Sequence, residues 1–360
     1  MKRLPQFLFI LVSALTIAFL PAAGLQAAQN FYQTHNLVSD GFVAADHTDP
    51  NLVNAWGIAF NPNAVVWVAS NGAGVSTLYD GLGVPQTLVV TVPLPGSVSG
   101  ASTPTGIVFN SSSDFKVSKG NTSGAAAFIF ATEDGTISGW SPGVDPTNAI
   151  LMVDNSASGA VYKGLALGGN GTAHFLYATN FKTGRIDVFD SSFHPATLSG
   201  SFLDPGIPDD FAPFGIQNIN GDIYVTYAKR DPATLDDVKG KGLGFVNVFD
   251  SNGNLIRRVA TKGKLNAPWG LAMAPADFGK FSNRLLVGNF GDGRINAFDI
   301  GTGRAAGTLQ TSQGKDLKID GLWGLSFGNG VKDQPTNVLF FTAGPGDEAH
   351  GLYGSIEPVQ

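Results

Sequence analysis

Ala55-Trp56-Gly57-Ile58 is the first of six versions of one tetrapeptide in this chain, each with a glycine followed by Ile or Leu. The other five versions are Pro104-Thr105-Gly106-Ile107, Tyr162-Lys163-Gly164-Leu165, Pro213-Phe214-Gly215-Ile216, Pro268-Trp269-Gly270-Leu271 and Leu322-Trp323-Gly324-Leu325. Successive glycines of this repeat are 49, 58, 51, 55 and 54 residues apart. Self-similarity at a period of this length predicts one structural unit repeated six times.

Short apolar runs separated by turn residues follow each tetrapeptide. In the third unit, Phe175 to Asn180 leads through a glycine-bearing turn into the alternating run Arg185 to Asp190. A further run closes several units, as in Gln86 to Val92, Ala149 to Val153 and Leu255 to Ala260. Alternation with period two and enrichment in β-branched and aromatic residues are typical of strands. Four strands in each of six units predict an all-β fold, a six-bladed β-propeller with four-stranded antiparallel blades.

The last unit lacks its fourth strand. After the third run, Leu352 to Ile356, the chain ends at Gln360, whereas a surplus strand, Phe31 to Val38, precedes the first unit. We expect this N-terminal strand 31–38 to join the last blade, because pairing with 352–356 covers two open sheet edges and closes the ring. Each repeat glycine is expected in an innermost strand, where crowded backbones leave no room for a side chain.

The first 28 residues have the order of a secretory signal peptide. Lys2 and Arg3 precede a largely apolar run of 14 residues, Phe7 to Leu20, and a small-residue stretch that ends at Ala28. This run is shorter than the roughly 18 to 20 residues that cross a bilayer. We therefore expect cleavage near Ala27 or Ala28, a secreted or periplasmic protein, and a single propeller domain over residues 29–360 without a membrane span. An uncleaved N-terminal anchor is the alternative.

Composition and charge bear on the kind of partner. There are 22 Lys and Arg against 28 Asp and Glu, a net charge of −6, and no basic cluster, so nucleic acid is an unsuitable partner. The chain has no cysteine, so its stability cannot depend on disulfides. We expect a monomer whose partner is a small molecule, a glycan or a protein.

The repeat resembles the NHL-type six-bladed propellers. More narrowly, Asn36-Leu37-Val38-Ser39-Asp40, followed by Asp49-Pro50-Asn51-Leu52-Val53-Asn54 before the first tetrapeptide, is similar to an uncharacterised family of exported bacterial propellers. Some members of that family carry a C-terminal Pro-Glu-Pro sorting tail, which this chain lacks. The resemblance implies fold and compartment, but no activity.

Propeller ligands usually bind on the face where the loops entering the innermost strands meet the loops joining the second and third strands. An aromatic pocket with a few polar groups is typical of small-molecule sites. Our candidate ligand-binding residues on this face are Trp56, Lys163, Asn180, Arg185, Phe214, Arg230, Trp269, Asn289 and Trp323. In the alternative interpretation the aromatic residues only fill the channel, and the asparagines only bond their own turns. Lys163 replaces an aromatic residue near the axis, so its ammonium requires an anionic partner.

Catalysis is the other possibility. The calcium-dependent propeller lactonases and esterases use an amide or carboxylate before the repeat glycine, and none of the six tetrapeptides has one there. No cofactor is therefore predicted, although calcium could bind a different set, Glu133, Asn180, Asn289 and Asp320. His350, close to Glu348, is the candidate general base.

Three hypotheses of function follow. The first is a secreted propeller that binds a small or extended ligand at the channel mouth. The second is a propeller hydrolase, lactonase or lyase that uses polar residues on the same face. The third is a cell-surface scaffold for protein contacts.

Overall fold

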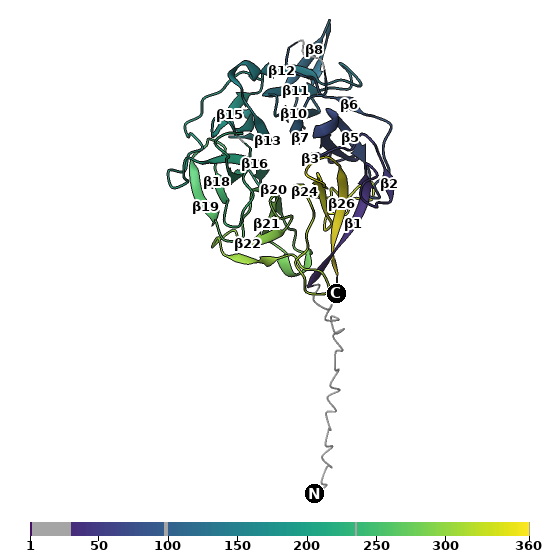
Figure 1. Ribbon diagram of the computed structural model, residues 1–360, viewed down its shortest axis with the longest axis vertical. Coiled ribbons are helices and arrows are strands. Elements are labelled where there is room, and N and C mark those ends of the chain that lie inside the picture. The colour runs from purple at the N-terminus through teal and green to yellow at the C-terminus, as the bar shows by residue number, and fades with distance from the viewer. Residues whose placement is uncertain (2–29, 97–99, 235, 360) are drawn as a thin grey trace.

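The computed structural model describes residues 1, 30–96, 100–234 and 236–359. From residue 30 onward the described residues form a ring of six blades around a central axis (Figure 1). The predicted signal peptide, except for Met1, lies outside the described residues. The first blade consists of β3 (Ala55–Phe60), β4 (Val66–Ser70), β5 (Val75–Tyr79) and β6 (Val90–Thr91). The second consists of β7 (Pro104–Phe109), β10 (Phe128–Thr132), β11 (Thr136–Trp140) and β12 (Ile150–Asp154). The third consists of β13 (Tyr162–Gly169), β14 (His174–Asn180) and β15 (Arg185–Asp190).

The remaining three blades complete the ring. The fourth blade consists of β16 (Phe211–Ile219), β17 (Asp222–Lys229), β18 (Phe245–Phe249) and β19 (Leu255–Thr261). The fifth consists of β20 (Pro268–Met273), β21 (Leu285–Asn289), β22 (Ile295–Phe298) and β23 (Ala305–Thr308). The sixth consists of β24 (Leu322–Phe327), β25 (Leu339–Ala343), β26 (Leu352–Val359) and β1 (Phe31–Ser39). Paired neighbours within each blade run antiparallel. The predicted fold class is confirmed.

The repeat glycines set the width of the ring. A Cβ atom on Gly215 would lie only 2.0 Å from the carbonyl oxygen of Trp269 in the next blade. At the other five repeat glycines, the nearest backbone atom of the following blade is 2.3 to 2.9 Å from such a Cβ. Real Cβ atoms do not approach backbone so closely, so only glycine allows the six innermost strands to converge.

The N-terminal strand closes the ring as predicted. β1 pairs antiparallel with β26, from Phe31 opposite Val359 to Ser39 opposite Leu352, and thus becomes the outer strand of the last blade. The sequence placed the pairing at 352–356, and the structure extends it to Val359. Both ends of the ring therefore lie in one sheet, in which the purple β1 runs beside the yellow β26 (Figure 1).

Several details differ from a regular repeat. In the third blade only three strands form the sheet, and Ala196 donates one backbone hydrogen bond to Val188 of β15 in the outer position. The second blade carries an additional hairpin, β8 (Lys116–Lys119) and β9 (Thr122–Ala125), and β2 (His47–Thr48) pairs parallel with β1. The described part of the chain contains three single turns of 3₁₀ helix, η1 (Asn71–Ala73), η2 (Ser156–Ser158) and η3 (Gly279–Phe281). Among the described residues no helix is long and apolar enough to span a bilayer.

Candidate functional site

Large aromatic side chains fill the channel beneath one face. Trp56 and Trp323 are each 1% exposed, with ring centroids 3.8 Å apart, and Phe290 stacks on Trp323 at 3.9 Å. Phe214 is fully buried against the edge of Trp323. We call Trp56, Phe181, Phe214, Phe290 and Trp323 the aromatic plug. Its buried rings offer no surface to a ligand, so the packing favours the alternative interpretation of Trp56, Phe214 and Trp323 as channel filling.

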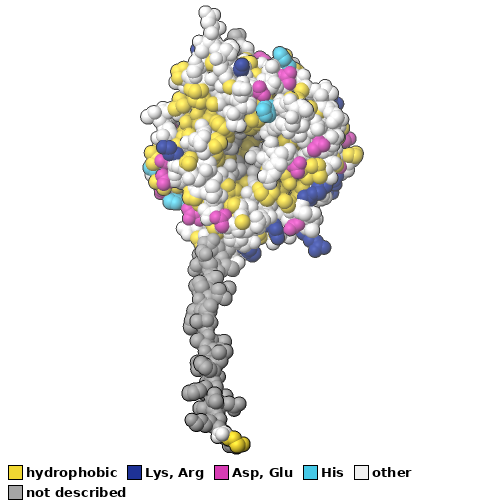
Figure 2. Space-filling model, turned by 180° about the vertical axis from the view of Figure 1, so that it is seen from behind, with side chains coloured by type: hydrophobic (Ala, Val, Ile, Leu, Met, Phe, Trp, Pro, Cys, Tyr) yellow, Lys and Arg dark blue, Asp and Glu magenta, His cyan; other side chains and the backbone are white. Residues whose placement is uncertain are grey.

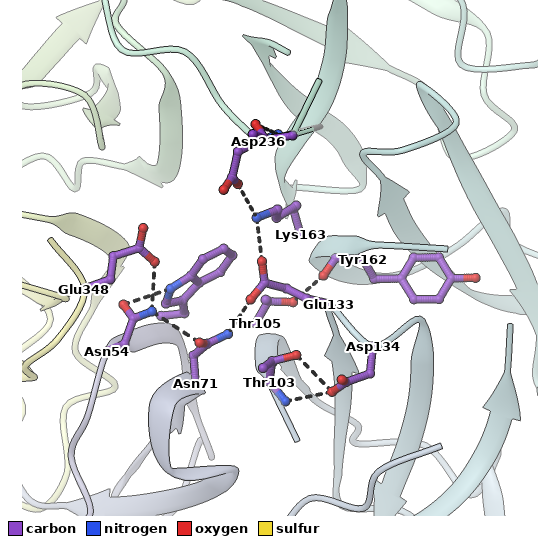
Figure 3. A network of polar contacts seen from close by, with 12 residues as sticks. Asn54, Asn71, Thr103, Thr105, Glu133, Asp134, Tyr162, Lys163, Asp236 and Glu348 are labelled. Atoms are coloured by element: carbon purple, nitrogen blue, oxygen red, sulfur yellow. Dashed lines mark hydrogen bonds and ion pairs between the residues drawn. The ribbon is translucent and has the colours of Figure 1, made fainter. Parts of the chain in front are cut away.

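Lys163 lies directly above the aromatic plug and is paired with acids from two other blades. Its Nζ contacts Glu133 Oε1 at 2.5 Å and Asp236 Oδ1 at 3.3 Å, and it lies 5.1 Å from the Trp56 ring centroid (Figure 3). Burial alone would lower the pKa of Lys163, but the neighbouring carboxylates outweigh burial and hold this pKa above its ordinary value. Lys163 therefore remains an ammonium and is unsuited to act as a nucleophile or base.

Two asparagines connect the aromatic plug to the charged groups. Asn54 Oδ1 accepts the indole N–H groups of Trp56 and Trp323 at 3.0 and 3.1 Å. Its Nδ2 donates to Glu348 Oε2 at 2.9 Å and to Asn71 Oδ1 at 3.2 Å. Asn71 in turn donates to Glu133 Oε2 at 2.9 Å (Figure 3). One continuous hydrogen-bond network thus fixes the rings and orients two carboxylates.

Carboxylates outnumber cations at this end of the channel. Glu133, Asp236, Asp237 and Glu348 come from the loops that join the second and third strands of three blades, and we call the space between them the acidic mouth. Burial raises the pKa of Glu348, whereas Asn54 and Lys163 oppose that rise. Burial likewise raises the pKa of Asp237 to about 7, against the opposing effect of Lys163. Its Oδ2 atom is buried and has no hydrogen-bond partner among the described residues.

The other predicted polar residues of the site, Asn180, Arg185, Arg230 and Asn289, take no part in this network. Asn180 accepts from the backbone N–H of Val161 and donates to Asp187, and Asn289 donates to the Lys264 carbonyl and to Asp292. The guanidinium of Arg230 binds three backbone carbonyls, those of Phe181, Lys182 and Asp209. Arg185 is exposed and lines a groove along the outer part of the third blade.

The alternative calcium set and the candidate catalytic pair are not brought together. Asn180 donates to Asp187 and Asn289 donates to Asp292. Asp320 accepts from the backbone of Gly346, and Glu133 pairs with Lys163. In the described part of the chain no group of three or more acidic, His or Cys side chains is arranged to hold a metal ion. His350 Nδ1 bonds Asp40 at 2.7 Å and its ring stacks on Phe42, whereas Glu348 bonds Asn54, so these two residues have different surroundings.

Replacing Asp237 with Asn tests the burial of this carboxyl. Because the folded pKa is about 7, above the usual 3.8, the folded protein holds a proton that the unfolded chain releases, and stability falls as pH rises from about 4 to 7. Asp237→Asn removes this loss. We expect it to raise the free energy of unfolding by up to about 3 kcal/mol near pH 8, and by little near pH 4. Urea unfolding at both pH values measures the difference. The exposed Asp347→Asn is the control, and equal behaviour of the two variants would contradict the assignment.

Fold and site together define a six-bladed β-propeller with an aromatic-filled channel and an acidic mouth. The chain belongs to the same protein family as an uncharacterised protein of Acanthamoeba polyphaga mimivirus, to which it is 35% identical over 340 residues, covering 92% of this chain and 82% of the relative. A second uncharacterised mimivirus protein is 34% identical over 345 residues, covering 94% and 89%. No family model matches the sequence. These relatives are viral, so a bacterial origin of the family is not supported.

Solved structures support the fold alone. A streptogramin B lyase structure superposes with a TM-score of 0.53 and 13% identity, over 91% of this chain and 97% of that chain. A Bacteroides thetaiotaomicron protein of unknown function superposes with a TM-score of 0.54 and 10% identity, over 91% and 76%. At such low identity the lyase activity stated for the first protein says nothing of the chemistry of this chain.

Proposed function

We propose that this protein is a binding propeller whose acidic mouth takes an organic cation. The observation that carries the proposal is the charge imbalance: the carboxylates of Glu133, Asp236, Asp237 and Glu348 face the cations Lys163 and Lys239. Even with Asp237 protonated, the mouth holds more negative than positive charge. In a partly desolvated space an additional positive group on a ligand would be attracted.

One ring beside the mouth is accessible, that of Trp269, and it favours an ammonium over an inorganic ion. Lys239 Nζ lies 4.5 Å from the ring centroid of Phe290, and Lys163 Nζ lies above Trp56, so the protein's own cations already use these rings. Trp269 is the one repeat tryptophan that is partly exposed, and its indole N–H bonds the Lys163 carbonyl at 2.9 Å. Cation–π attraction of this kind supplements carboxylate pairing for alkylammonium groups.

Thermal melting in the presence of chosen ions tests the proposal. We expect spermidine to raise the melting temperature by about 2 °C or more at saturating concentration, whereas succinate, calcium chloride and EDTA leave it unchanged. The shift should increase from about pH 6 to pH 8, because Asp237 ionises near pH 7. Glu348→Gln keeps an oxygen acceptor for Asn54 and should reduce the shift. An equal shift in this variant, or a shift with calcium but not with spermidine, would oppose the proposal.

A second function is favoured by Asp237 itself. A carboxyl with a pKa of about 7 is suited to general acid–base catalysis at neutral pH, and it lies within electrostatic reach of Lys163 and Glu348. A hydrolase or lyase that uses this group would show a rate dependent on an ionisation near pH 7. We expect Asp237→Asn to abolish any such turnover, while a binding-only mouth still binds spermidine in this variant but loses the increase in the melting shift between pH 6 and pH 8.

Export is part of the proposed function. We infer that residues 1–28 direct the chain across a membrane and are removed near Ala27 or Ala28, since their order of charge, apolar run and small residues fits a signal peptide. Intact mass measurement of the protein recovered from a secreting host should show a chain that begins near residue 28 or 29. Recovery of the full-length chain in the membrane fraction would favour an uncleaved anchor.

A further inference from the structure

The two ends of the channel are built from different positions of the repeat. The position before each repeat glycine holds a large side chain in five of the six tetrapeptides, and these side chains gather at the acidic-mouth end. Two residues after the glycine the side chain is small in four repeats: Ala59, Ala166, Ala272 and Ser326. Small residues around the axis leave space that large ones would occupy. The channel is consequently filled at one end and hollow at the other.

A cavity of about 350 Å³ occupies the hollow end. Five blades line it with the residue two positions after the repeat glycine: Ala59, Val108, Ala166, Gln217 and Ser326. Figure 2 shows a face hollowed at its centre, with hydrophobic side chains gathered around the opening. The repeat glycines and the aromatic plug separate this cavity from the acidic mouth, so it constitutes a second site.

The lining of this cavity combines apolar side chains with uncharged polar groups, and the polar groups make up the larger share of its accessible surface. Phe60 and Phe109 are half-buried at its edge, beside Ile58 and Leu167. The innermost strand of each blade pairs on one side only, so its other edge presents backbone groups to the axis. None of the described residues that line the cavity is charged. A charged ligand would therefore lose its hydration without gaining a counterion.

One side chain is placed to fix the orientation of a ligand. The Asn218 amide is already used, because its Nδ2 donates to the Leu167 carbonyl at 2.8 Å and its Oδ1 accepts from Gly221 at 2.9 Å. The amide of Gln217, in contrast, is exposed at the cavity. An exposed amide can both donate and accept a hydrogen bond. Gln217 is thus the lining side chain best suited to recognise a hydroxyl or carbonyl group on a ligand.

We propose that the cavity opposite the acidic mouth binds a neutral small molecule with an apolar, ring-sized body and one hydrogen-bonding group, which Gln217 recognises. The cavity volume lies at the lower end of the range of small-molecule pockets, which is roughly 300 to 1,000 Å³. This site is independent of the cation site. The propeller would then offer one face to cations and the other to neutral apolar compounds.

Binding of three naphthalene derivatives to the full chain tests this proposal. We expect 2-naphthol and naphthalene to bind saturably at one site, with 2-naphthol the tighter ligand, and 2-naphthoate to bind at least about tenfold more weakly than 2-naphthol. Gln217→Leu should weaken 2-naphthol about fivefold and leave naphthalene unchanged. Ser326 is partly exposed in the cavity lining, so Ser326→Phe should fill the cavity and abolish binding of both 2-naphthol and naphthalene.

Two controls keep the outcomes distinct. Glu348→Gln at the acidic mouth should leave 2-naphthol binding unchanged, and Ser326→Phe should leave the spermidine shift unchanged, so failure of one site does not imply failure of the other. A cooperative unfolding transition in each variant shows that it is folded. The proposal is overturned if no neutral compound binds the wild type, if 2-naphthoate binds as tightly as 2-naphthol, or if folded Ser326→Phe retains full affinity.

Discussion

Gly215→Ala is expected to destabilise the protein by about 3 kcal/mol or more, the largest effect of an added methyl group among the six repeat glycines. The new Cβ would lie 2.0 Å from the carbonyl oxygen of Trp269 and 3.0 Å from Thr226 Oγ1. Both the glycine and the carbonyl belong to innermost strands, so neither can move without widening the ring. Urea unfolding measures the loss of unfolding free energy directly, from the shift of the transition midpoint when the dependence of the free energy on urea concentration is unchanged.

Two other glycines provide the comparison for this variant. At Gly164 the nearest backbone atom is 2.9 Å away, so Gly164→Ala should cost only about 1 kcal/mol. Gly143 has no atom within 4 Å of an added Cβ and has an ordinary φ, so Gly143→Ala should be neutral or slightly stabilising. If all three variants have the same stability, the close approach of neighbouring blades does not determine the width of the ring.

Tyr32→Ala is expected to destabilise the protein by about 3 to 5 kcal/mol, because Tyr32 holds the closing strand against the fifth blade. The side chain is 1% exposed and its ring lies 4.9 Å from that of Phe278. Its hydroxyl donates to the Phe278 carbonyl and accepts from the Phe281 N–H, both at 3.0 Å. Truncation removes a large buried ring and leaves both backbone groups without their partner.

Gln33→Ala on the same strand is the matched control, since Gln33 is exposed and its loss should change stability by no more than about 0.5 kcal/mol. Removing residues 31–39 entirely should abolish cooperative unfolding, because β26 would lose its partner along its whole length. A cooperative transition of unchanged midpoint in the deleted chain would show that the ring closes without β1.

The sequence predicts most of the fold because the repeat records a physical constraint. A glycine at the same place in all six units indicates that the innermost strands are crowded. A surplus strand at the N-terminal end and a missing strand at the C-terminal end predict that the first and last strands pair to close the ring. The β8–β9 hairpin and the irregular outer edge of the third blade were not predicted. Both lie at the periphery, where the chain is not restrained by its neighbours around the axis.

The geometry of the candidate site was predicted only in part. The ammonium of Lys163 near the axis requires an acid, and the structure supplies Glu133 and Asp236. Asp236 and Asp237 were missed, although they lie in the enlarged loop between β17 and β18, where two adjacent acids were a usable signal. The pairing of Glu348 with Asn54 could not be predicted, since it joins residues 294 positions apart whose approach depends on ring closure.

Calorimetric titration with spermidine, in buffer of low ionic strength near pH 8, tests the central claim that the acidic mouth is a cation site. We expect one saturable site in the wild type and a loss of affinity of about tenfold or more in the double variant Asp236→Asn, Glu348→Gln, which removes two carboxylates while keeping their shape. The single variant Arg185→Gln, on the outer part of the third blade, should bind as the wild type does. Undiminished affinity in the folded double variant, or no binding to the wild type, would contradict the claim.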